Sequence, residues 1–198
     1  MSGTPGRPLS AELSDQLLSV AVDILAEEGW GRLNSDRVAA RAHAGKAGIY
    51  RRWPSMPALA RHAVSRFRLI DVPSDTGSLR GDLAELVGRW RLPLDREERA
   101  AAALVGAARY DPELRAALDA ALVGPLHAAV AVLGERAVDR GELAGRAPIE
   151  LLCSVVEALL WQRYISGGDG AIPAEQIDRL VDGVLVPLVS ARWQDAAA

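Results

Sequence analysis

The stretch from Ser35 to Trp53 constrains the fold most, because it has the pattern of two short helices joined by a tight turn. His43-Ala44-Gly45 forms the turn, and the second helix is predicted over residues 46–52. Ile49 and Trp53 are spaced i, i+4, so they lie on one side of that helix and can bury it. The pattern predicts a helix-turn-helix, whose second helix has the size to enter the major groove of DNA.

The residues around this stretch follow a longer ordered pattern. A glycine-aromatic step ends the helix before it, and an aromatic-Pro-Ser step followed by an Ala-Leu helix comes after it. The elements of the pattern are Gly29-Trp30, Val38-Ala39, Tyr50, Trp53-Pro54-Ser55 and Ala58-Leu59. In this order, the run from Gly29 to Val64 resembles the DNA-binding domain of the TetR family of transcriptional regulators.

Four positions depart from the family pattern. His43 stands where the turn usually has Gly, and His adopts the left-handed backbone more readily than most residues do. Gly45 replaces a capping Ser or Thr, and Gly is an acceptable N-cap. Gly48 replaces a Thr that often touches DNA, and Met56 replaces a Lys that commonly holds a phosphate. We therefore expect these changes to leave the fold intact. Gly48 and Met56 slightly favour a protein that has this fold but no longer binds DNA.

The composition favours an all-α protein. Hydrophobic residues make up 49% of the 198 residues and aromatic residues only 5%, and Ala and Leu dominate. The periodic segments predict about nine helices. With the resemblance, we expect a helix-turn-helix DNA-binding domain over residues 1–55, whose residues 1–9 form a flexible arm. An effector-binding and dimerisation domain is expected over residues 56–198, and a helix over 56–70 is expected to connect the two.

Charge is divided unevenly along the chain. Residues 1–70 hold ten Lys and Arg against six Asp and Glu, a net charge of +4, and residues 71–198 hold thirteen against twenty, a net charge of −7. A basic head on an acidic body suits a polyanionic partner, although chance asymmetry is the alternative.

The predicted DNA contacts follow from the resemblance and from side-chain chemistry. The Tyr50 hydroxyl is expected to reach a phosphate, as the matching tyrosine does in the family, with a half-buried packing role as the alternative. Lys46, the only lysine, can reach a guanine edge or a phosphate. Ala47 can touch a thymine methyl, and Gly48 allows close approach. Arginines predicted to hold phosphates are Arg51 and Arg52, together with Arg37 and Arg41, for which a solvated helix face is the alternative.

The last two predicted helices carry full apolar stripes at the helical period. Both follow a body that already has helices to build a core, and the resemblance implies a homodimer held by a four-helix bundle. The residues expected in the dimer interface are Leu152, Val156, Leu160, Val181, Val184, Leu185 and Leu188.

A small-molecule effector pocket is implied by the resemblance alone. Its candidate lining residues are Trp90, Leu104, Leu122, His127, Trp161 and Tyr164, each of which could equally be a core residue. Cys153 is the single cysteine, and the three histidines share no metal-like spacing with it or with each other. We therefore expect no metal and no cofactor.

Motifs of catalysis are missing from the sequence, so an enzyme is not expected. Neither a hydrophobic run of bilayer length nor an apolar signal segment in the first eight residues is apparent, which predicts a cytoplasmic protein with no membrane partner. The leading hypothesis is a ligand-responsive repressor that binds a pseudo-palindromic double-stranded DNA operator as a dimer. The alternative is a co-regulator that keeps the fold, binds protein and no longer binds DNA.

Overall fold

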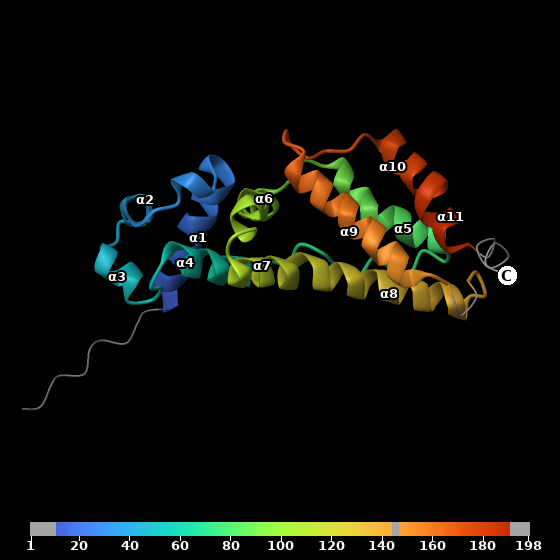
Figure 1. Cartoon of the computed structure of the whole chain (residues 1–198), viewed down its shortest axis with the longest axis horizontal. Coiled ribbons are helices and arrows are strands. Elements are labelled where there is room, and N and C mark those ends of the chain that lie inside the picture. The colour runs from blue at the N-terminus through green and yellow to red at the C-terminus, as the bar shows by residue number, and fades with distance from the viewer. Residues whose placement is uncertain (1–10, 144–146, 191–198) are drawn as a thin grey trace, which may run out of the picture.

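The computed structural model describes residues 11–143 and 147–190, and the secondary structure of these residues is entirely helical. Nine helices form this part of the chain when each uninterrupted run that contains α-helix is counted once, which confirms the predicted class and number. A small head of helices lies at one end of an elongated molecule, and a larger body lies at the other (Figure 1). The predicted flexible arm over residues 1–9 falls outside the described residues.

The head consists of four helices, the middle two of which form the helix-turn-helix. These are α1 (Ala11–Glu28), α2 (Ser35–Arg41), α3 (Lys46–Tyr50) and α4 (Met56–Val64). Polar caps set two of the starts, since Asn34 accepts a hydrogen bond from the backbone of α2 and Ser55 accepts one from that of α4. His43 has a φ of 49°, so the left-handed turn predicted at this histidine is present.

The connection between head and body differs from the prediction. α4 ends at Val64, whereas a helix was predicted to continue to residue 70. Phe67 and Leu69 are buried while Arg66 and Arg68 are exposed, and this alternation is the period of an extended chain. The head is therefore joined to the body by an irregular linker that crosses the body before the next helix begins.

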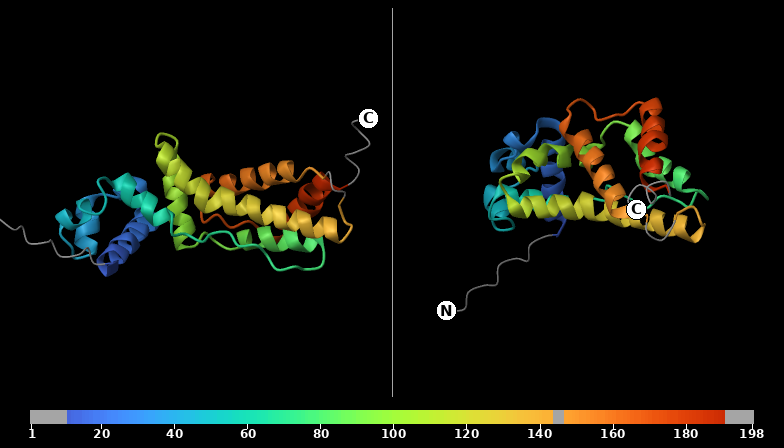
Figure 2. Two further views of the ribbon diagram at one scale, coloured as in Figure 1. Left: turned by 90° about the horizontal axis from the view of Figure 1, so that it is seen from below. Right: turned by 45° about the vertical axis from the view of Figure 1, so that its right-hand side comes forward.

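The body is built from five helical runs, two of which consist of two α-helices joined by a π-helical turn. They are α5 (Leu79–Gly88), α6 (Arg96–Ala108), α7 (Pro112–Leu118) with α8 (Gly124–Asp139), α9 (Ile149–Ile165), and α10 (Ala174–Leu180) with α11 (Val186–Val189). In this arrangement α8 lies between α5 on one side and α9 on the other (Figure 2).

Two prolines explain the π-helical turns. Pro125 and Pro187 lack a backbone N–H and would clash with the carbonyl four residues earlier. In each case the preceding residues widen the helix, and Gly124 donates its N–H to the carbonyl of Asp119, five residues back. Val186 bonds to Val181 in the same way. The helices therefore continue through the prolines.

Because α7 continues into α8, the run Pro112–Asp139 has 28 residues and is long and apolar enough to cross a bilayer by length and composition alone. The prediction that no hydrophobic run reaches this length was wrong. The helix packs against α5, α6 and α9, and its fully buried side chains include Leu114, Leu118, Leu122, Leu126 and Leu133. A core helix passes the same test, so this feature is weak evidence for a membrane span.

Candidate nucleic-acid interface and a cavity in the body

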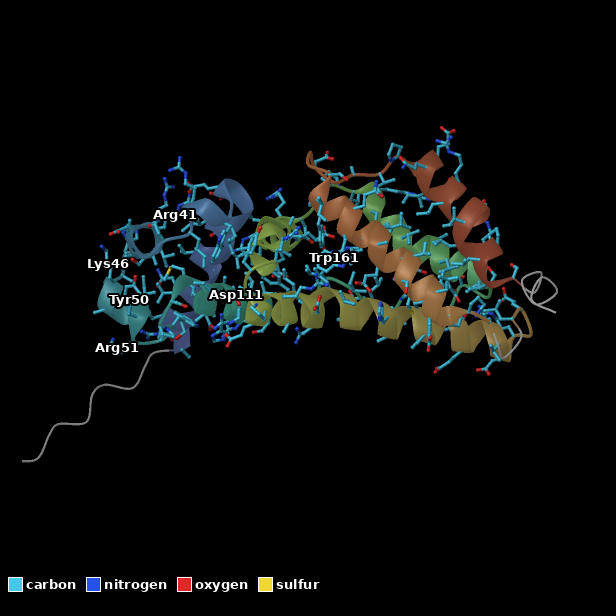
Figure 3. All side chains as sticks on the ribbon, viewed as in Figure 1. Arg41, Lys46, Tyr50, Arg51, Asp111 and Trp161 are labelled. Carbon is cyan, nitrogen blue, oxygen red and sulfur yellow. The ribbon has the colours of Figure 1, made fainter. Side chains whose placement is uncertain are left out.

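The recognition helix α3 lies at the tip of the head, the end of the molecule farthest from the body (Figure 3). Ile49 is fully buried and fastens the helix to the head. The other side of the helix faces solvent: Lys46, Ala47 and Arg51 are exposed, and Tyr50 is 51% exposed. Gly48 lies partly buried between them. An exposed short helix with two cations and a phenol is chemically suited to phosphates and base edges.

Tyr50 is held to α2 at its hydroxyl end. Its O–H donates to Oγ of Ser35 at 3.2 Å, so the ring lies across the outer side of the helix-turn-helix. The alternative for Tyr50 was a half-buried packing role, and the exposed side chain does not fit it. The same hydroxyl retains acceptor capacity and can turn its proton to a phosphate oxygen.

The side chain of Lys46 forms an ion pair with Asp36 of α2. The hydrogen bond that Lys46 donates to this carboxylate raises the pKa of the lysine. Both side chains are more than half exposed, and such a pair contributes little to stability. Lys46 can therefore exchange this carboxylate for a phosphate at small cost.

The arginines of α2 are already paired within the head. Arg37 contacts Glu28, and Arg41 contacts Glu27 at 2.8 Å and Glu28 at 2.9 Å. These carboxylates lie at the end of α1, so the two arginines fasten α2 to α1. A phosphate contact by either arginine stays a prediction, and it would have to compete with these glutamates.

Arg52 lies on the inner side of the head rather than at its tip. Its Nε donates to Oγ of Ser14 at 2.9 Å, and its Nη1 donates to the carbonyl of Gly48 at 2.9 Å. A phosphate contact by Arg52 would require breaking these bonds. Arg51, one residue earlier, is exposed, and no ion pair joins it to any residue that the structure describes. The two adjacent arginines therefore occupy different environments.

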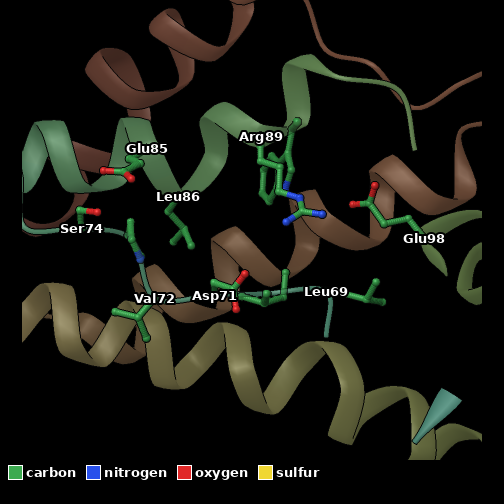
Figure 4. Close-up of a pocket in the computed structure, with 11 residues that line it drawn as sticks. Leu69, Asp71, Val72, Ser74, Glu85, Leu86, Arg89 and Glu98 are labelled. Carbon is green, nitrogen blue, oxygen red and sulfur yellow. The ribbon is translucent and has the colours of Figure 1, made fainter. Parts of the chain in front are cut away.

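The body contains a cavity of about 200 Å³ between the linker, α5 and the start of α6 (Figure 4). Leu69, Val72 and Leu86 give it an apolar wall, and Trp90 is nearly completely buried behind it. Its charged lining residues are Asp71, Glu85, Arg89 and Glu98. Of the six residues predicted for an effector pocket, only Trp90 lines this cavity.

The other five predicted pocket residues are placed elsewhere. Leu104 and Leu122 are fully buried in the core. His127 and Trp161 share the carboxylate of Glu157, at 2.9 Å and 3.1 Å, in a partly exposed cluster between α8 and α9. Tyr164 is buried beneath Trp161, and burial raises the pKa of its phenol.

Sequence reasoning missed most residues of the cavity wall. Asp71 and Val72 belong to the irregular linker, which has no helical periodicity, and a helix was predicted to end just before them. Glu85 and Arg89 lie on polar positions near α5, where a solvated helix face is the usual expectation. The one available signal was the clustering of Val72-Pro73-Ser74, which marks a loop.

The residues predicted for a dimer interface are mostly turned toward the core of the same chain. Five of the seven have no exposed surface, namely Leu152, Val156, Leu160, Val181 and Leu185. In the single chain these five side chains are covered by its own core, and their contact with a partner stays a prediction. Val184 is 43% exposed and Leu188 is half-buried. On α9 the exposed large apolar residues are Leu151 and Ile165.

The chain matches two family models. Residues 17–63 match the one described as bacterial regulatory proteins, tetR family, and residues 73–184 match the tetracyclin repressor-like C-terminal domain. The chain is 36% identical over 185 residues to the DNA-binding transcriptional repressor TetR of Mycobacteroides abscessus, covering 89% of this chain and 93% of that protein. An HTH-type transcriptional regulator of Mycobacterium tuberculosis is 32% identical over 173 residues, covering 87% and 85%.

Solved structures share the fold. A TetR-family transcriptional regulator from Rhodococcus sp. superposes with a TM-score of 0.67 at 18% identity, covering 91% of this chain and all of that one. The TetR family transcription regulator SCO0332 has a TM-score of 0.57 at 25% identity, covering 87% and 98%. With a family model over more than half of its length, this chain belongs to the TetR family of helix-turn-helix DNA-binding transcriptional regulators, which are not enzymes.

Proposed function

We propose that this protein is a cytoplasmic repressor that binds a pseudo-palindromic DNA operator as a homodimer and leaves it when a small molecule fills the body. The observation that carries the proposal is the exposure of Lys46, Tyr50 and Arg51 at the tip of the head, on a helix that Ile49 fastens. The relative from Mycobacteroides abscessus, which bears the name of a repressor, supports the direction of control.

An apolar surface on the last helices supports the homodimer. Val184 and Ile165 are exposed, and a hollow of about 420 Å³ between α9 and α10 is lined by Leu159, Leu180 and Val184. Exposed apolar residues at two adjacent helices are the usual sign of a contact surface. A second copy of the same surface would cover it around a two-fold axis.

The cavity beside the linker supports an amphipathic effector that carries a positive charge. Arg89 pairs with Asp95 at 3.1 Å and Glu98 pairs with Arg163 at 3.3 Å, whereas neither Asp71 nor Glu85 forms an ion pair with any described residue. Two exposed carboxylates at an apolar wall favour a cation attached to an apolar body. The linker that forms this wall leads directly into α4, so an occupant acts on the head.

An electrophoretic shift assay tests the proposal on the DNA upstream of the protein's own gene, in a series of salt concentrations. We expect a retarded band whose affinity falls steeply with salt, because phosphate contacts release counterions. Absence of a shift at the lowest salt concentration, with a dimer that is folded by circular dichroism, would contradict repression by DNA binding.

The alternative function is a co-regulator that has lost DNA binding. The pairing of Arg37 and Arg41 with glutamates of α1 is the observation that favours it, because it neutralises two cations of the head. A folded dimer that fails to shift DNA and instead captures the DNA-binding domain of another regulator would support this alternative.

A further inference from the structure

Two arginines hold the head on the body from different sides, and the first is Arg96 of α6. Its Nε donates to Oδ1 of Asp23 at 2.6 Å, and its Nη2 donates to the carbonyl and the hydroxyl of Ser19 at 2.7 Å and 2.9 Å. Both partners belong to α1, which packs against α6 more extensively than any other pair of elements does. With three hydrogen bonds and this packing, Arg96 marks a firm attachment.

The second arginine is Arg61 of α4, which pairs with the start of α7. Its Nη2 lies 2.7 Å from Oε2 of Glu113, and its Nη1 lies 3.6 Å from Oδ2 of Asp111. Asp111 is at the same time the N-cap of α7, since its Oδ1 accepts the N–H of Leu114 at 2.9 Å. Asp111 lies at the junction of head and body in Figure 3. Arg61 therefore ties α4 to the first residues of the long helix.

The far end of the same long helix is tied to the linker. Arg136 of α8 donates from Nη1 to the carbonyl of Pro73 at 2.9 Å, and Pro73 lines the cavity. Arg140, one turn later, bonds to Asp82 of α5 at 3.0 Å. The run of α7 and α8 thus connects the wall of the cavity at one end with α4 at the other.

We propose that Arg61 is a positioning residue that fixes the angle of the head on the body and thereby the half-site spacing that a dimer selects. Since Arg96 holds α1 firmly, the contact of Arg61 with Glu113 decides how far α4 can turn about that attachment. In a dimeric helix-turn-helix protein, the distance between the two recognition helices sets the spacing of the half-sites. This inference rests on the proposed function, because it requires a DNA-binding dimer.

Selection of binding sites from random-sequence duplex DNA by the full-length protein, followed by sequencing, tests the inference. We expect the wild type to favour one half-site spacing over spacings that are one base pair longer or shorter. Arg61→Met should reduce this preference by about two- to fivefold, which is the effect expected from losing a partly exposed ion pair. Glu113→Gln removes the same ion pair by changing its partner in the body, and it should reduce the spacing preference by a similar factor. The double variant should do no more than either single variant.

Arg66→Met is the matched control. Arg66 follows the end of α4, and its ion pair with Asp15 at 2.5 Å lies entirely within the head, so its loss should leave the spacing preference unchanged. Broadening in the control, or an unchanged spacing profile in both Arg61→Met and Glu113→Gln, overturns the inference. Because Glu113 is 73% exposed, Glu113→Gln decides the question if Arg61→Met fails to fold. Failure of the wild type to select paired half-sites would instead contradict the proposed function.

Discussion

Nε of Arg52 donates a hydrogen bond to Oγ of Ser14 at 2.9 Å and so joins the end of the recognition helix to α1. Its neighbour Arg51 is exposed at the tip of the head. Adjacent cations of the same kind therefore have separable roles, one in the stability of the head and one at its outer surface.

We expect Arg52→Ala to lower the free energy of unfolding by about 1–2 kcal/mol, because it removes charge-assisted hydrogen bonds that are partly shielded from water. Arg51→Ala should change it by less than about 0.5 kcal/mol, as an exposed surface substitution does. Urea unfolding followed by circular dichroism measures both. Equal losses in the two variants would show that the bond to Ser14 contributes nothing.

Tyr50→Ala should abolish operator binding and leave a folded dimer, because the exposed phenol is the proposed phosphate contact. Tyr50→Phe keeps the ring and removes the hydroxyl, so it isolates the contribution of the hydrogen bond. We expect Tyr50→Phe to weaken binding by about tenfold, the value of one such bond at an interface. Unchanged gel-shift affinity in Tyr50→Ala would refute this site.

Local chemistry made the helix starts of this fold predictable from the sequence. Asn34, Ser55, Asp95 and Asp111 each accept a hydrogen bond from the backbone of the helix that follows, which depends only on residues three positions away. The turn at His43 was predictable for the same reason, since its conformation is decided within a few residues.

Features decided by tertiary packing were not predictable in this way. Phe67 extends the i, i+4 spacing of α4, yet the chain is extended there because the body buries Phe67 and Leu69 together. α9 carries apolar residues on two sides, so its periodicity could not show that Leu152 faces the core while Leu151 faces solvent. The cavity wall was missed because it belongs to this misassigned linker.

The carboxyl of Asp82 predicts how stability depends on pH. Burial alone would raise the pKa of this fully buried group, but hydrogen bonds from the hydroxyl and the N–H of Thr76 and from Arg140 lower it below the ordinary value of 3.8. A carboxyl whose pKa is lower in the folded state stabilises the protein fully at pH values above the pKa that it has in the unfolded chain. That contribution is lost as the pH falls through the pKa that Asp82 has in the folded protein.

We therefore expect Asp82→Asn to reduce stability at pH 7 by about 1–3 kcal/mol, the cost of disrupting a buried hydrogen-bonded group, and to flatten the loss of stability below about pH 4. Asp75→Asn is the control, because Asp75 also pairs with Arg140, at 2.8 Å, but is 54% exposed. Thermal unfolding between pH 3 and pH 7, roughly the range in which Asp titrates, measures both. The same acid dependence in Asp82→Asn as in the wild type would contradict the assignment.

Substitution of Val184 tests the proposed dimer surface. Val184 is 43% exposed on the π-helical turn of the last helical run, beside the hollow that faces α9. A charge placed in the centre of an apolar interface must be desolvated without a partner, so Val184→Glu should convert a dimer into a monomer.

Val138→Glu is the matched control, since Val138 is 40% exposed on α8 and has the same side chain. Analytical ultracentrifugation distinguishes the outcomes. A wild type that is monomeric, or a Val184→Glu variant that stays dimeric, would place the contact between protomers on another surface.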